Sequence, residues 1–166
     1  MQPYIMQRGK APLAFLLAQV GAHAAMRFSE RISGLNLTPP DAGILRMLGN
    51  SGGISQQDLS TRLGIHPSRL VAILDALEER RLVERRANDD DRRQYALHLT
   101  EKGQAILGEI GRIGREHTES LCASLTAAER EQLAALLQKV ATEQGLSPGV
   151  HPGYRRMRPA TKEAKA

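Results

Sequence analysis

The chain has 166 residues, a formal net charge of +5, 3% aromatic residues and no tryptophan. This length makes one domain with a real core, and the scarcity of aromatic residues favours helices packed through aliphatic side chains over a β-sandwich. A single cysteine excludes a disulfide framework within one chain, and the basic balance fits a polyanionic partner without proving one.

The N-terminal part predicts an arm followed by one helix. Residues 1–10 are polar, basic and free of acids, which indicates a flexible arm. Residues 11–34 are expected to form a dimerisation helix, because apolar side chains recur there at helical spacing. This stripe consists of Leu13, Leu16, Leu17, Val20, Ala24 and Phe28.

Residues 38–100 predict a helix-turn-helix followed by a hairpin. The first helix starts at Thr38-Pro39-Pro40-Asp41, where a capping threonine, a first-turn proline and an acid combine. Ser55 caps the next helix, and Gly64 supplies the left-handed residue that ends it. Another helix opens at His66-Pro67. Its inward side chains are expected to be Leu70, Ile73, Leu74 and Leu77.

The outer face of this last helix carries the candidates for reading DNA. Arg69 can donate two hydrogen bonds to a guanine edge, Ser68 can contact phosphate or base, and Ala72 can touch a thymine methyl. His66 is interpreted as a cap or a phosphate contact. Further candidates for phosphate contacts are Thr61, Arg62, Arg85 and Arg86.

A two-stranded hairpin is expected from 82–86 and 94–99, because Tyr95, Leu97 and Leu99 alternate with polar residues. The connector, residues 87–93, is polar and turn-forming. One or two of its aspartates can brace Arg92 or Arg93 by hydrogen bonding, so that a guanidinium points into a narrow minor groove.

Residues 101–145 predict two more helices that complete a dimerisation region. The first carries Gly103, Gly108, Gly111 and Gly114, whose spacing could let another helix approach closely. The second starts at a capping box, Thr126 to Glu129, and has the apolar stripe Leu133, Leu136, Leu137 and Val140. Residues 146–166 are expected to be a basic, flexible tail, which could add phosphate contacts.

The apolar stripes at both chain ends need a partner surface, since a winged helix already has its own core. A homodimer with interleaved terminal helices supplies that surface. It would also present two recognition helices to half-sites about 34–36 Å apart.

The wing carries a specific resemblance. The run from Asp91 to Thr100, DRRQYALHLT, is similar to the D-x-R-x-x-x-L-x-L-T wing signature of the MarR family of transcriptional regulators. The run LGIHPSRLVAILDALEERRLVERR resembles that family's recognition helix and first wing strand. The weaker likeness extends from about Leu13 to Gln144. Many relatives have glycine where this chain has Arg81, and a small polar residue where it has Arg69.

The resemblance implies specific roles. Ser68, Arg69 and Ala72 take base-facing positions, and Asp91 and Arg93 form a wing-tip pair. It also implies a pocket between the dimerisation helices and the DNA-binding lobe for a small aromatic acid. His23 and Arg27 could pair there with a carboxylate, although a solvated helix face explains them too.

Other chemistry finds no support in the sequence. There is no phosphate-binding loop, nucleophile elbow or paired catalytic carboxylate spacing, so we expect no enzyme, no cofactor and no metal site. Cys122 is interpreted as a small buried hydrophobe and His117 as a core residue. With neither a signal segment nor an apolar run that could span a bilayer, a cytoplasmic location is expected.

The sequence therefore predicts a mainly α protein with a small β-hairpin wing: a winged helix-turn-helix flanked by N- and C-terminal dimerisation helices. The expected function is sequence-specific transcriptional regulation, as a repressor that binds double-stranded DNA as a homodimer and is released by an aromatic ligand. Two alternatives stay open: a non-specific or architectural DNA-binding protein, and a winged-helix protein-interaction module.

Overall fold

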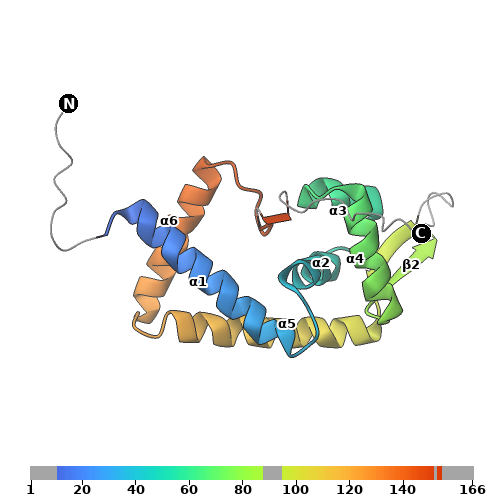
Figure 1. The fold of residues 1–166 in the computed structure, drawn as a ribbon, viewed down its shortest axis with the longest axis horizontal. Helices are drawn as coiled ribbons and strands as arrows, with labels where there is room; N and C mark the ends of the chain where they lie inside the picture. Colours follow the sequence, from blue (N-terminus) through green and yellow to red (C-terminus); the bar gives the residue numbers. More distant parts are fainter. Residues whose placement is uncertain (1–10, 88–94, 152, 155–166) are drawn as a thin grey trace, which may run out of the picture.

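The structure is a computed structural model and describes residues 11–87, 95–151 and 153–154. The helices in these residues are α1 (Leu13–Ser33), α2 (Pro39–Gly49), α3 (Gln56–Leu63), α4 (Pro67–Glu79), α5 (Glu101–Leu121) and α6 (Ala127–Glu143). The strands are β1 (Ile54–Ser55), β2 (Val83–Ala87) and β3 (Tyr95–Leu99). Figure 1 shows α6 at one end of the molecule and α4 with β2 at the other, with α5 running along one side between them.

Local capping signals set most helix starts. Thr38 and Asp41 form a reciprocal capping box on α2, and Thr126 and Glu129 form one on α6. Ser55 caps α3 by accepting the backbone N–H of Asp58 at 3.0 Å. These interactions span only three residues, which explains why the sequence predicted them.

The core lies in the winged lobe. Fully buried side chains come from α2, α3, α4, the turn before β2, the sheet and the end of α1: Ile32, Ile44, Leu45, Leu59, Leu63, Leu70, Leu74, Leu77, Leu82, Val83 and Leu97. The inward face predicted for α4 is confirmed, since Leu70, Ile73, Leu74 and Leu77 are all buried.

The wing is larger than the expected two-stranded hairpin. The sheet has the order β1-β3-β2 with both pairings antiparallel. Ile54 of β1 pairs with Leu97, and Val83 of β2 pairs with Leu99. The sequence missed β1 because a strand of two residues has no readable period; its pairing with β3, not its composition, makes it a strand.

The helix α5 is attached to the lobe through Gly103. A Cβ at this position would overlap the carbonyl oxygen of Leu82 and lie 3.0 Å from its carbonyl carbon. Thr100 completes the junction, since its hydroxyl accepts the Gly103 N–H at 3.0 Å and donates to the Arg81 carbonyl at 2.6 Å. The close neighbour is therefore a backbone turn and not a helix. Among the described residues nothing lies within 4 Å of a Cβ built at Gly108 or Gly114.

The terminal helices leave apolar side chains uncovered. On α1, Leu13 is 73% exposed and Val20 is 52% exposed, while α6 buries none of its residues. Cys122, at the end of α5, is half-buried, not fully buried as expected. No helix among the described residues is long and apolar enough to cross a bilayer.

The segment after α6 corrects a further expectation. The sequence predicted a flexible tail from residue 146, but Tyr154 is buried against α2. A composition poor in apolar residues hides such docking, because one aromatic side chain with a matching notch is enough to anchor a short segment.

Candidate nucleic-acid interface

The orientation of α4 is fixed at both its start and its inner face. His66 caps the helix: its Nδ1 accepts the Ser68 N–H at 3.3 Å and lies 2.8 Å from the Ser68 hydroxyl. Leu70 and Leu74 are completely buried, which holds the roll of the helix about its axis. The opposite edge therefore faces solvent and is free to enter a groove of DNA.

That edge contains predicted residues and two that the sequence reading missed. Ser68 and Ala72 are exposed, as expected. Val71, 36% exposed, and Asp75 share the edge with them. The spacing 68, 71, 72 and 75 marks one side of a helix and could have revealed both. Val71 offers apolar contact of the kind that a thymine methyl takes.

Arg69 lies beside this edge and not in the middle of it. The residue is half-buried, and its Nε is shielded from solvent without a hydrogen-bond partner in the described part of the chain. A shielded, unpaired donor is costly, so the side chain is open to rearrangement once an acceptor is offered.

The helix-turn-helix junction is held by a buried hydroxyl. Ser60 donates to the Ile65 carbonyl at 2.8 Å, and Gly64 between them has φ +61°. Thr61 and Arg62 are exposed in the last turn of α3, where phosphate contacts were predicted. The Thr61 hydroxyl donates to the Gln57 carbonyl at 3.0 Å, and the lone pairs of the hydroxyl oxygen stay open to solvent. Arg62, the next residue, is exposed as well.

Arg85 connects the wing to the recognition helix. Its guanidinium donates to Asp75 at 2.7 Å and also pairs with Glu78, both on α4, and its side chain is only 24% exposed. Burial alone would lower the pKa of Arg85, but the hydrogen bond that it donates to Asp75 and the charges of Glu78 and Asp75 raise the pKa overall. We expected Arg85 to contact phosphate; its carboxylate partners make it a brace between β2 and α4.

The remaining wing candidates differ in what the structure says of them. Arg86 is exposed and pairs with Glu84, its near neighbour on β2. Such an exposed pair is weak, so the guanidinium can exchange partners. The predicted residues Asp91, Arg92 and Arg93 lie outside the described residues.

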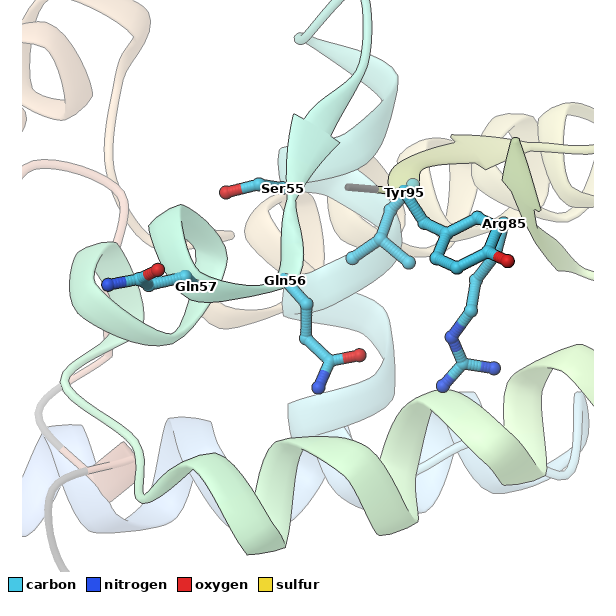
Figure 2. Close-up of a pocket in the computed structure, with 6 residues that line it drawn as sticks. Ser55, Gln56, Gln57, Arg85 and Tyr95 are labelled. Atoms are coloured by element: carbon cyan, nitrogen blue, oxygen red, sulfur yellow. The ribbon is translucent and has the colours of Figure 1, made fainter. Parts of the chain in front are cut away.

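A pocket of about 270 Å³ lies between the start of α3 and the strands β2 and β3 of the wing. It is lined by Ser55, Gln56, Gln57, Arg85, Tyr95 and Leu97. Figure 2 shows the side chains of Gln56 and Arg85 directed toward α4, the Tyr95 ring beside Arg85, and Gln57 turned away. Sequence reasoning missed Gln56 and Tyr95, because only the folded wing brings them together.

A group of basic side chains lies between α1 and α5. His117 of α5 packs against Phe28, with ring centroids 5.8 Å apart. Burial lowers the pKa of His117, and the charges of Arg31, Arg27 and His23 lower it further, whereas a hydrogen bond to the backbone of Ala24 raises it. The predicted pair, His23 and Arg27, lies on α1, the helix whose Phe28 packs against His117.

Arg31 is the member of this group that the sequence reading missed. Its Nε is buried and has no partner in the described ranges. The signal was present, since His23, Arg27 and Arg31 follow one another at four-residue spacing on α1. Arg27 also donates to Glu30 at 2.6 Å, so the group is not purely cationic.

The helix-turn-helix, the three-stranded sheet and the exposed edge of α4 define a winged helix-turn-helix protein. A family model described as "MarR family" matches residues 35–94. The HTH-type transcriptional repressor Rv2887 of Mycobacterium tuberculosis is 31% identical over 133 residues, 80% of this chain and 96% of that protein. The chain belongs to the MarR family, a family of transcriptional regulators.

Solved structures agree with this assignment. Wild-type MarR from Escherichia coli without ligand superposes with a TM-score of 0.70 at 28% identity, covering 80% of this chain and 98% of that one. Rv2887 in complex with DNA gives 0.69 at 30% identity, covering 79% and 98%. Rv2887 in complex with p-aminosalicylic acid gives 0.64 at 30% identity, covering 79% and 99%.

Proposed function

We propose that this chain is a sequence-specific DNA-binding repressor that acts as a homodimer on a pseudo-palindromic promoter site. The observation that carries the proposal is the exposed edge of α4, held at a fixed orientation beside the wing by Arg85. Similarity to a repressor solved with DNA supports it. A regulator with this role has to reach the promoter, so we also propose a cytoplasmic location.

Each part of the interface has a proposed role on the duplex. The edge of α4 enters the major groove, where Arg69 reads a guanine, Ser68 contacts base or phosphate, and Val71 and Ala72 contact a thymine methyl. At the wing, Arg93, braced by Asp91 and accompanied by Arg92, reaches the minor groove. His66, Thr61, Arg62 and Arg86 contact phosphates.

The pocket beside Arg85 fits this docking. When α4 lies in the major groove and the wing in the adjacent minor groove, the sugar–phosphate strand between the grooves has to pass between them. Gln56 and Tyr95 line the pocket on the wing side of this path and carry hydrogen-bond donors. We therefore add both to the proposed phosphate contacts, while Arg85 keeps the two walls together.

The uncovered terminal helices support the homodimer. The exposed stripe of α1 and the exposed stripe of α6, in which Leu136 is 55% exposed, leave more apolar surface open than scattered side chains explain. Figure 1 places α6 and the start of α1 far from α4 and β2. A dimer built through these helices leaves both recognition helices free for DNA.

Selection of bound duplexes from a random pool, followed by affinity measurements, tests the DNA proposal. We expect an inverted repeat, and Arg69→Ala should weaken binding to it by about 5- to 150-fold, equivalent to about 1–3 kcal/mol, while relaxing one base position. An unchanged base preference in Arg69→Ala would remove the reading role of that side chain. Absence of any enriched sequence would favour a non-specific binder, and absence of DNA binding would favour a protein-interaction module.

We further propose that a small aromatic acid binds the basic side chains of His23, Arg27, Arg31 and His117 and weakens DNA binding. The unpaired Nε of Arg31 can donate to a carboxylate, and the Phe28 ring offers an apolar wall. The relative solved with p-aminosalicylic acid shows that a protein of this fold binds such a compound. Ligand bound there would shift the population of lobe orientations.

Calorimetric titration with p-aminosalicylic acid tests the effector proposal independently of DNA. Arg31→Met should abolish the heat of binding, whereas Arg115→Met, at an exposed arginine of the same α5 that carries His117, should leave it unchanged. Equal heats for both variants, or no heat with the wild type, would reject this site and leave the DNA proposal standing.

A further inference from the structure

The segment that follows α6 returns to the winged lobe. We call residues 146–154 the strap; residue 152 lies outside the described residues. In Figure 1 it leaves the end of α6 in orange and ends in red on the side of the lobe where α2 and α3 lie. The strap is therefore a second connection between the α6 end and the lobe, besides α5. The helix α6 itself buries none of its residues.

Tyr154 anchors the strap in a notch on α2. The ring is 6% exposed, and its hydroxyl donates to the Pro40 carbonyl at 2.7 Å. The notch exists because residue 43 is glycine: a Cβ there would overlap the phenol oxygen and lie 3.1 Å from Cζ. Burial, the largest effect, raises the pKa of Tyr154 far above its usual value, with Asp41 adding to the rise and Arg46 opposing it.

A second contact holds the middle of the strap. Arg46, one helical turn beyond Gly43, donates to the Gly149 carbonyl at 2.6 Å. Gly149 has φ +70°, a conformation that a glycine adopts without strain. Val150 packs against the core beside these contacts. The strap is therefore attached at several points along α2, and the glycines at 43 and 149 fit their places in it.

These contacts close a ring through the molecule. The chain runs from the lobe through α5 to α6, and the strap brings it back to α2 of the same lobe. Rotation of the lobe about its junction with α5 would pull α2 against the strap and so strain the Tyr154 and Arg46 contacts. The recognition helix α4 moves with the lobe, since its inner face is part of the lobe's core.

We propose that Tyr154 is a positioning residue that sets the separation of the two recognition helices in the dimer, and so the half-site spacing that the protein accepts. The proposal rests on the proposed function, because it needs a dimer that reads two half-sites. Tyr154 touches no DNA in this account. It acts through α2, by limiting the orientations that the lobe takes relative to α6.

Spacing profiles test the proposal. The selected inverted repeat is remade with its half-sites moved apart or together by one to three base pairs, and affinities are measured for the wild type, Tyr154→Ala and Tyr154→Phe. We expect the wild type to bind one spacing more tightly than the others. In Tyr154→Ala, the ratio between the affinities for the best and the worst spacing should fall about tenfold. Tyr154→Phe, which keeps the ring and loses one neutral hydrogen bond, should stay within about threefold of the wild-type profile.

Gly43→Ala attacks the same contact from the other side, since the added Cβ expels the ring. It should reproduce the flat profile of Tyr154→Ala, and the double variant should be no flatter than either single variant. Gly108→Ala is the matched control: it is also a helix glycine, but with open space around it, and should keep the wild-type profile.

Affinity for an isolated half-site separates positioning from damage to the fold. A positioning role leaves it unchanged in Tyr154→Ala, whereas a loss of folded protein lowers it together with every spacing. A wild-type profile in both Tyr154→Ala and Gly43→Ala would overturn the strap proposal alone. A wild type without preference for any sequence would overturn the proposed function instead.

Discussion

Substitution of two glycines in α5 by alanine should change stability in opposite directions. At Gly103, the new Cβ would overlap the carbonyl oxygen of Leu82 and lie 3.0 Å from the carbonyl carbon, and both of these Leu82 atoms are backbone. Neither can turn aside as a side chain would, so the first turn of α5 has to move away from the start of β2. At Gly108 the Cβ meets nothing within 4 Å among the described residues.

The magnitudes follow from these contacts. Overpacking at Gly103 costs about 1–3 kcal/mol, and separation would also strain the hydrogen bond from the Thr100 N–H to the Leu82 carbonyl, 3.2 Å long. The higher helix propensity of alanine stabilises both variants by at most about 1 kcal/mol, and Gly108→Ala has this gain without the clash. Because the propensity gain is common to both variants, we expect them to differ by the clash alone, about 1–3 kcal/mol, which is about 2–12 °C in Tm for a chain of this size.

Thermal unfolding of both variants at one protein concentration measures the difference. The concentration has to be fixed because assembly of subunits stabilises the folded state by mass action. The account predicts a Tm below the wild type for Gly103→Ala and a Tm at or above it for Gly108→Ala. Equal Tm values would show that α5 and the turn before β2 are not packed as described.

Three further results are expected. Arg81→Gly should stabilise the protein by about 0.5–1 kcal/mol in urea unfolding, because Arg81 has φ +57° and glycine relieves that strain. Part of the gain is offset, since glycine also makes the unfolded chain more flexible; a destabilised variant would contradict this. The pKa of His117 is lowered in the folded state by burial first and by nearby cations, so its contribution to stability is present above pH 6.5 and is lost as the pH falls below it. His117→Phe should therefore show a shallower loss of stability between pH 7 and 5 than the wild type, and an identical slope would count against the assigned environment. Arg93→Ala should weaken operator binding without changing the sedimentation of the dimer, and wild-type affinity would discard its minor-groove role.

The sequence predicted those features that depend on near neighbours. The capping pairs Thr38–Asp41 and Thr126–Glu129 span three residues, and the left-handed turn at Gly64 needs only its own backbone. The inward face of α4 follows from helical period. Each of these signals is complete within a dozen residues, so no knowledge of the rest of the fold is required.

The features that the sequence missed depend on residues distant along the chain. Strand β1 exists only because β3 pairs with it, and Arg85 became a brace because Asp75 and Glu78 lie across a turn from it. Tyr154 reaches Pro40 over 114 positions. Many arginines on the surface look alike in sequence, and only the assembled fold decides which one is paired.

The residues of the two candidate binding sites show the same division between near and distant neighbours. The exposed positions of α4 proposed to face DNA bases were accessible from periodicity, and the exposed Val71 was accessible in the same way. The full basic group between α1 and α5 was not, because His117 joins it from a helix that starts more than 60 residues after α1 ends. The sequence predicted only His23 and Arg27; Arg31 was missed although it continues their spacing, and packing added His117.

Selection of duplexes from a random pool by the wild-type chain, in the presence of excess competitor DNA at physiological salt, tests the central claim most directly. The account predicts that an inverted repeat is enriched, with half-site centres about one helical turn apart, as two recognition helices on a two-fold axis require. Enrichment of a single unrepeated motif, or of no motif at all, would contradict it.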